Sequence, residues 1–199
     1  AFGMPMASDK VVINDISMVI DSENYLIRDE LTLAAPSWTL EFWVAMPDQL
    51  ATITPIAQWG ESTNGSDGFG LVLIDSGEGM YWSLMNGDSN IVENYNYKYN
   101  ASDNGDAQHI ALVYTNNALT LYVNGEPSTA ALSVTYDDLP RPLTLGYFNM
   151  SSESISETIT RWYLDEVLIN YSVAKYTAPF TPEAKAFDID YLPVQVTAH

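Results

Sequence analysis

The feature that most constrains the fold is the recurrence of short apolar segments separated by turn residues. Residues 37–46, SWTLEFWVAM, alternate in polarity, which places Trp38, Leu40, Phe42 and Val44 on one face of a strand. Further segments typical of strands are residues 54–60, 68–75, 80–86, 109–115, 118–126, 142–148 and 161–169. Because long helical periodicity is absent, the pattern predicts an all-β, two-sheet antiparallel sandwich of the jelly-roll type.

Two of the linkers between these segments are typical of tight hairpins. Residues 76–79, SGEG, separate 68–75 from 80–86 and predict a hairpin. Asn116 and Asn117 separate 109–115 from 118–126, and asparagine tolerates the positive φ that a two-residue turn requires.

The charge balance restricts the kinds of partner. The chain has 199 residues, with 7 basic and 26 acidic residues and a net charge of −19, so binding to nucleic acid or to an anionic membrane surface is unfavourable. There is no cysteine and there are only two histidines, which argues against disulfides and zinc. No apolar run is long enough to span a bilayer. The first ten residues lack the pattern of a signal peptide, so none is expected.

The adjacent acids Asp165 and Glu166 are the first candidate site. On a regular strand they would point to opposite faces, so they would not converge on one bond as a catalytic pair. We interpret them as structural, with Asp165 accepting hydrogen bonds from loop groups. The alternative is that Asp165 is a ligand of a calcium ion, although calcium needs six to eight oxygens and one strand does not supply them. No other cofactor is expected.

A second candidate is the segment NYNYKYN, residues 94–100. Alternation would place Tyr95, Tyr97 and Tyr99 on one face, where they would pack against the domain itself, form a subunit interface or stack on sugar rings.

The loop at residues 62–68, with Trp59 before it, offers Asn64 and Asp67 as polar ligand contacts. The alternative is a solvated loop without a ligand. His109 begins an apolar strand and is interpreted as structural. No phosphate-binding glycine loop, nucleophile elbow or zinc-protease motif is present in the sequence.

Four segments, in order, resemble the laminin-G-like, concanavalin A-like jelly-roll domains, in the form found in bacteriophage virion proteins. They are WTLEFWV (38–44), QHIALVYTNNALTLYVNGE (108–126), PLTLGYF (142–148) and YLDEVLINYSVAKYTAPFTPEAKAF (163–187). The sequence departs from the family pattern at Gln108, where the family often has an aromatic residue or histidine. The related glucanases carry Glu-x-Asp-x-x-Glu on one strand, and this motif is missing at residues 163–168.

The resemblance implies one jelly-roll domain over residues 21–187, preceded by an extension and first strand at 1–20 and followed by a tail at 188–199. It also implies a non-enzymatic structural protein of a virion, in a capsid decoration or tail fibre. Its expected partners are other virion proteins, copies of itself and host surface glycans, and its expected location is the surface of an extracellular particle. The alternative is a free carbohydrate-binding module or lectin, either calcium-dependent or calcium-independent.

Overall fold

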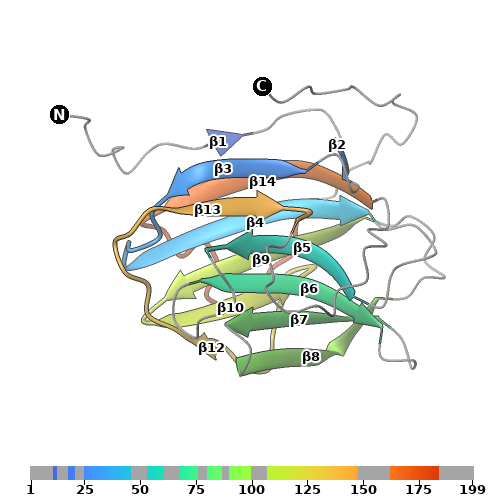
Figure 1. Ribbon diagram of the computed structural model, residues 1–199. Coiled ribbons are helices and arrows are strands. Elements are labelled where there is room, and N and C mark those ends of the chain that lie inside the picture. The colour runs from blue at the N-terminus through green and yellow to red at the C-terminus, as the bar shows by residue number, and fades with distance from the viewer. Residues whose placement is uncertain are drawn as a thin grey trace.

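The computed structural model describes residues 11–12, 18–20, 25–45, 53–60, 68–75, 80–86, 90–99, 107–147 and 162–183. These residues form fourteen strands and no helix, and so contain no helix able to cross a membrane. The strands form two sheets that pack face to face (Figure 1). All pairs are antiparallel, which confirms the predicted all-β sandwich.

The first sheet has the order β1-β14-β4-β9-β10-β11, with β2 also paired to β14 and β12 to β10. Its strands are β1 (Val11–Val12), β2 (Met18–Ile20), β4 (Ser37–Ala45), β9 (Gln108–Thr115), β10 (Ala118–Val123), β11 (Glu126–Pro127), β12 (Leu132–Ser133) and β14 (Trp162–Tyr171). The register places strands from the two halves of the chain side by side, with Trp38 opposite Tyr171.

The second sheet has the order β3-β13-β5-β6-β7-β8. Its strands are β3 (Leu26–Leu31), β13 (Arg141–Leu145), β5 (Ile53–Trp59), β6 (Phe69–Asp75), β7 (Met80–Asn86) and β8 (Asn90–Tyr99). β6 and β7 pair directly from Gly70 with Met85 to Asp75 with Met80, as the predicted hairpin requires.

The core lies between the sheets and follows from the alternation of β4. Trp38, Leu40, Phe42 and Val44 all belong to the main buried cluster, as the sequence predicts. Four tryptophans contribute the largest fully buried side chains of this core, namely Trp38, Trp59, Trp82 and Trp162. The indole of Trp82 donates a hydrogen bond to Oε1 of Gln108 (3.1 Å), so the departure from the family pattern at Gln108 is accommodated at the edge of the core.

Two asparagine turns shape the β9–β10–β11 meander. Asn116 and Asn117 both have positive φ, 52° and 59°, and form the predicted two-residue turn. The segment 118–126, predicted as one strand, is instead interrupted at Asn124 and Gly125, whose φ values are 51° and 85°. Asn-Gly is a strong hairpin signal because both residues tolerate positive φ, and the strand prediction overlooked it.

Strand β14 contains a β-bulge at the acid pair. Asp165 lies opposite Trp43, and the next pair is Leu168 with Glu41, so β14 carries one more residue than β4 between these points. Glu166 has a φ of 48°. Trp162 and Leu164 face the core before the bulge, and Val167 and Ile169 face it after. Successive core-facing residues of β14 are therefore three positions apart across the acid pair and two positions apart elsewhere. The bulge therefore keeps the apolar residues inside.

After β14 the chain continues as residues 172–183, which we call the closing strap. It begins at Ser172, with a φ of 59°, and has no regular secondary structure. Ala174, Tyr176 and Phe180 of the strap pack on Ala111, Val113 and Tyr122, which lie on the outer face of β9 and β10. The strap thus covers part of the face of the first sheet that points away from the core.

Candidate functional site

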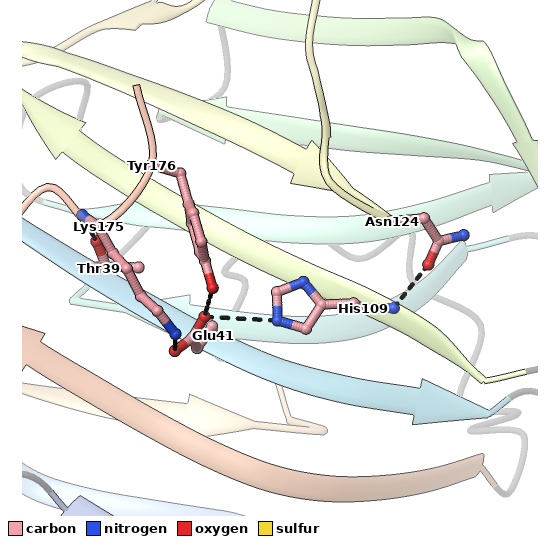
Figure 2. Close-up of polar contacts among 6 residues, drawn as sticks. All are labelled: Thr39, Glu41, His109, Asn124, Lys175 and Tyr176. Carbon is pink, nitrogen blue, oxygen red and sulfur yellow. Dashed lines mark hydrogen bonds and ion pairs between the residues drawn. The ribbon is translucent and has the colours of Figure 1, made fainter. Parts of the chain in front are cut away.

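The densest polar cluster in the described residues lies between this outer face and the closing strap. Glu41 of β4 stands at its centre and is only 5% exposed. Lys175 Nζ donates a hydrogen bond to Oε1 of Glu41, and the Tyr176 hydroxyl donates to Oε2 at 2.6 Å. Nε2 of His109 lies 3.5 Å from the same Oε2. Figure 2 shows the carboxylate held between Lys175, Tyr176 and His109.

The protonation states of the cluster follow from these contacts. Burial alone would raise the pKa of Glu41, but the hydrogen bonds from His109, Lys175 and Tyr176 outweigh it and lower that pKa from 4.5 to about 2. Burial and the hydrogen bond to Glu41 raise the pKa of Tyr176 to about 12. Burial opposes the charge of Lys175, yet the contact with Glu41 raises its pKa overall. Near neutral pH the cluster therefore holds an ionised Glu41, a charged Lys175 and a neutral tyrosine donor.

The backbone of the strap is hydrogen-bonded to the rest of the protein at two further points. Thr39 Oγ donates to the carbonyl of Val173 (3.0 Å) and accepts from the amide of Lys175 (2.9 Å). At the other end, the Phe180 amide donates to the carbonyl of Gly125 (3.0 Å). A Cβ at Gly125 would lie 1.8 Å from the Phe180 oxygen, so the strap requires glycine at this turn.

His109 lies at the edge of this cluster, buried among aromatic rings. Its ring makes edge contacts with Trp43, Tyr176 and Phe180, at centroid distances of 5.2, 6.3 and 5.7 Å. Its backbone amide donates to Oδ1 of Asn124 (2.8 Å). This environment agrees with the structural interpretation of His109.

Lys175, Tyr176 and His109 engage the two carboxylate oxygens of Glu41. The cluster is therefore best described as a fastening between strand β4 and the strap. The sequence analysis did not single out Glu41, because its partners Lys175 and Tyr176 are 134 and 135 residues away.

The acid pair does not behave as a regular strand would predict. Because of the bulge, Asp165 and Glu166 both lie between the core positions Leu164 and Val167, so the simple alternation that assigned them to opposite faces fails here. Asp165 Oδ1 accepts a hydrogen bond from the Glu166 amide (2.8 Å), in line with its structural interpretation. No cluster of three or more potential metal ligands occurs among the described side chains, and the calcium role of Asp165 stays a prediction.

Trp59 is a core residue and not a ligand contact. Its side chain is fully buried, its indole donates to the carbonyl of Leu31 (2.8 Å), and the ring packs against Tyr136 and the guanidinium of Arg141. The prediction that Trp59 contacts a ligand is corrected accordingly: the last residue of β5 still points inward, because its neighbour Leu143 on β13 also faces the core.

Of the other predicted ligand residues, only those in β8 belong to the described part of the chain. Asn64 and Asp67 lie outside the described residues. Tyr95, Tyr97 and Tyr99 belong to β8, whose pairing with β7 shifts: Tyr81 pairs with Lys98, and Trp82 pairs with Asn94. Three residues of β8 are therefore skipped, and unbroken alternation no longer fixes the faces of these tyrosines.

The structure also contains a pair of exposed tyrosines that the sequence analysis did not identify. Tyr25 precedes β3 and Tyr147 follows β13, and their rings stack at 5.1 Å with an interplanar angle of 25°. They are 42% and 40% exposed, and Ile27 on β3, two residues after Tyr25, is also exposed. Alternation does not reveal this pair, because the two residues lie outside the strands and meet only through the pairing of β3 with β13.

Comparisons with known proteins agree with the fold. The family model described as the concanavalin A-like lectin/glucanases superfamily matches residues 21–169. No curated protein matches the sequence. Among solved structures, the Trypanosoma rangeli sialidase is similar with a TM-score of 0.52 and 17% identity, covering 70% of this chain and 21% of the sialidase.

Two bacterial toxins are also similar in structure. The binding domain of botulinum neurotoxin serotype D gives a TM-score of 0.54 at 15% identity, covering 80% of this chain and 40% of that one. Botulinum neurotoxin type C gives 0.50 at 13% identity, covering 82% and 43%. The chain thus spans less than half the length of each, and at these identities the likeness concerns the fold.

The sialidase comparison corrects one prediction. The missing acid motif led to the prediction that the protein is not an enzyme, and this inference is wrong. A region of the same fold makes up 21% of the sialidase chain, which is an enzyme. The absence of paired acids from one such domain therefore does not exclude catalysis by the protein that contains it.

Proposed function

Because the chain belongs to the concanavalin A-like lectin/glucanases superfamily, we propose that it is a lectin-like module that binds carbohydrate. The observation that carries the proposal is the match over residues 21–169 together with a two-sheet sandwich whose loops connect antiparallel strands at both ends. Loops held by such a scaffold commonly carry binding residues.

The ligands named for two of the similar structures support the proposal of carbohydrate binding. Botulinum neurotoxin type C depends upon interaction with two ganglioside molecules to enter cells, and a Trypanosoma rangeli sialidase is described in complex with sialic acid. Both are glycan-recognising proteins that contain this fold. The proposal for the present chain names carbohydrate only, since the identity with them is low.

The proposal is tested with the purified full chain on a printed array of neutral and sialylated oligosaccharides, followed by calorimetric titration of the strongest hit. We expect saturable binding by the wild type, weakened by Asn64→Ala or Asp67→Ala if the loop after β5 contributes. Titration after treatment with a chelator decides whether calcium takes part. Absence of binding to every glycan on the array would refute a carbohydrate-binding function.

We further propose that the module acts on a virion, as a decoration or fibre component at the particle surface that also associates with copies of itself. The support is the closing segment, residues 163–187, whose sequence resembles the phage versions of the family. In this chain residues 172–183 form the strap that Glu41 fastens. Co-sedimentation of the tagged chain with particles from a phage lysate tests the location, and recovery only in the particle-free fraction would count against it.

A further inference from the structure

We propose that Tyr25 and Tyr147 form a stacking platform for a sugar ring of a neutral oligosaccharide, at the outer edge of the second sheet. This inference rests on the proposed carbohydrate-binding function and assigns it a place and a ligand class. Of the five large hydrophobic residues exposed in the described part of the chain, Tyr25 and Tyr147 stack on each other, and a third, Ile27, follows Tyr25 by two residues. Exposed apolar groups gathered in this way mark binding surfaces more often than scattered ones.

The local fold holds the two rings in position. β3 and β13 pair with Leu145 opposite Leu26, so the end of β13 lies beside the start of β3. Gly146 then turns the chain with a φ of 91°, and its amide donates to the carbonyl of Ile56 (2.9 Å). The hydroxyl of Thr144 donates to the carbonyl of Tyr147 (2.7 Å).

Glycine at residue 146 is required, because a Cβ there would lie 2.2 Å from Cγ2 of the buried Ile20. Tyr147 is therefore placed by a backbone turn that is itself anchored to the core. A platform that is already ordered before binding loses less conformational entropy when the ligand arrives.

The ring geometry suits a sugar better than a protein groove. The two tyrosine rings stack on each other at 5.1 Å and 25°, so each ring turns one flat apolar face away from its partner, and the two residues are 42% and 40% exposed. A pyranose ring has the matching character, with C–H groups on its face and hydroxyls around its edge. Tyrosine is suited to such contacts because one end of the side chain is apolar and the other hydrogen-bonds with water or ligand.

The charge of the protein selects among glycans. The net charge is −19, and the exposed residues that follow Ile27 on β3 are Arg28, Asp29 and Glu30, with one positive and two negative charges. A sialylated or sulfated glycan would be repelled by this field, particularly at low salt. We therefore assign the platform to neutral hexose oligosaccharides, in contrast to the sialic acid described for the sialidase.

The platform is separate from the loop that was predicted to bind. Gly60, at the end of β5, donates to the carbonyl of Pro142 near the start of β13, whereas Gly146 lies at the end of β13. The loop after Gly60 and the tyrosine pair thus begin at opposite ends of the same strand. Substitutions in the two places can be separated by experiment.

The test compares variants of the full chain on an array of neutral hexose oligosaccharides and their sialylated counterparts, with titration of the strongest neutral glycan. We expect Tyr147→Ala and Tyr25→Ala to weaken binding by about fivefold to a hundredfold, the range of one aromatic stacking contact. Tyr147→Phe retains the ring and should stay within about threefold of the wild type. Leu139→Ala, which truncates a more exposed residue (57%) beyond the other end of β13, is the control and should bind like the wild type.

Three outcomes would overturn the inference. If the wild type binds neutral glycans but Tyr25→Ala and Tyr147→Ala bind equally well, the platform is wrong while the carbohydrate-binding function stands. If sialylated glycans bind more tightly, the assignment to neutral ligands is wrong. If the alanine variants change only self-association, measured by analytical ultracentrifugation, the patch is a contact between copies. Failure of the wild type to bind any glycan would instead refute the proposed function itself.

Discussion

Glu41 is the residue whose chemistry depends most on the folded state. Its pKa falls from 4.5 to about 2, so the ionised form stabilises the fold at pH values above 4.5. This stabilisation is lost as the pH falls from about 4.5 to 2, because over that range the unfolded state takes up a proton at Glu41 that the folded state does not. The shift corresponds to about 3 kcal/mol, an upper bound because the Lys175 side chain is 43% exposed.

We predict that Glu41→Gln lowers the free energy of unfolding at pH 7 by about 1.5–3 kcal/mol, the range for hydrogen bonds to a buried charged group. Urea titrations at pH 7 and at pH 2.5 measure the effect. The difference between the wild type and the variant should shrink at the lower pH, because pH 2.5 lies below the unfolded-state pKa of 4.5 and close to the folded-state value of about 2, where most of the stabilisation from the ionised form is lost. A difference that stays constant from pH 7 to 2.5 would mean that the charge of Glu41 does not stabilise the fold.

Two small changes test how individual elements depend on single positions. The first concerns the bulge in β14. Deleting Glu166 would bring Val167 opposite Phe42 and restore continuous alternation, with Trp162, Leu164, Val167 and Ile169 still facing inward. We predict a folded variant within about 2 kcal/mol of the wild type. Deleting Leu168 is the matched control: it turns Ile169 outward and should prevent folding, as circular dichroism and thermal melting would reveal.

The second concerns the closing strap. Gly125→Ala places a methyl group against the Phe180 carbonyl at a positive φ, so the strap must leave the turn. We predict faster hydrogen exchange at the amide of Phe180, which donates to Gly125, and cleavage within residues 172–183 at lower protease concentration. Thr181→Ala, a change at an exposed strap residue, should leave both readouts unchanged. Equal exchange in the two variants would show that Gly125 does not fasten the strap.

The strands also show which features of the fold can be predicted from the sequence. The strands β4, β7 and β9 follow their predicted ranges within one residue, because alternation and turn residues are local signals. The bulge at Asp165 and the register shift in β8 were missed, since each depends on pairing with a neighbour. Neither Glu41 nor the tyrosine pair carries a local signal: Lys175 and Tyr176 lie more than a hundred residues from Glu41, and so does Tyr147 from Tyr25.

At the scale of the whole molecule, charge is the dominant feature. With 26 acidic and 7 basic residues, the folded chain concentrates like charges that the unfolded chain can separate. We predict that raising NaCl from about 10 to 150 mM increases the melting temperature by a few degrees, because the Debye length falls from about 30 to 8 Å. Calorimetry at pH 7 measures this, with KCl at equal ionic strength as the control. A melting temperature that falls with salt would show that local ion pairs outweigh the repulsion.

The position of β14 between β4 and the two short strands near the beginning of the chain has a consequence for synthesis. β4 leaves the ribosome long before β14 exists, and until then one of its hydrogen-bonding edges has no native partner. The sandwich therefore closes only once residue 171 has emerged, and its assembly is late and non-local. During that interval the unpaired edge of β4 is open to pairing with another chain, and the net charge of −19 opposes such an encounter.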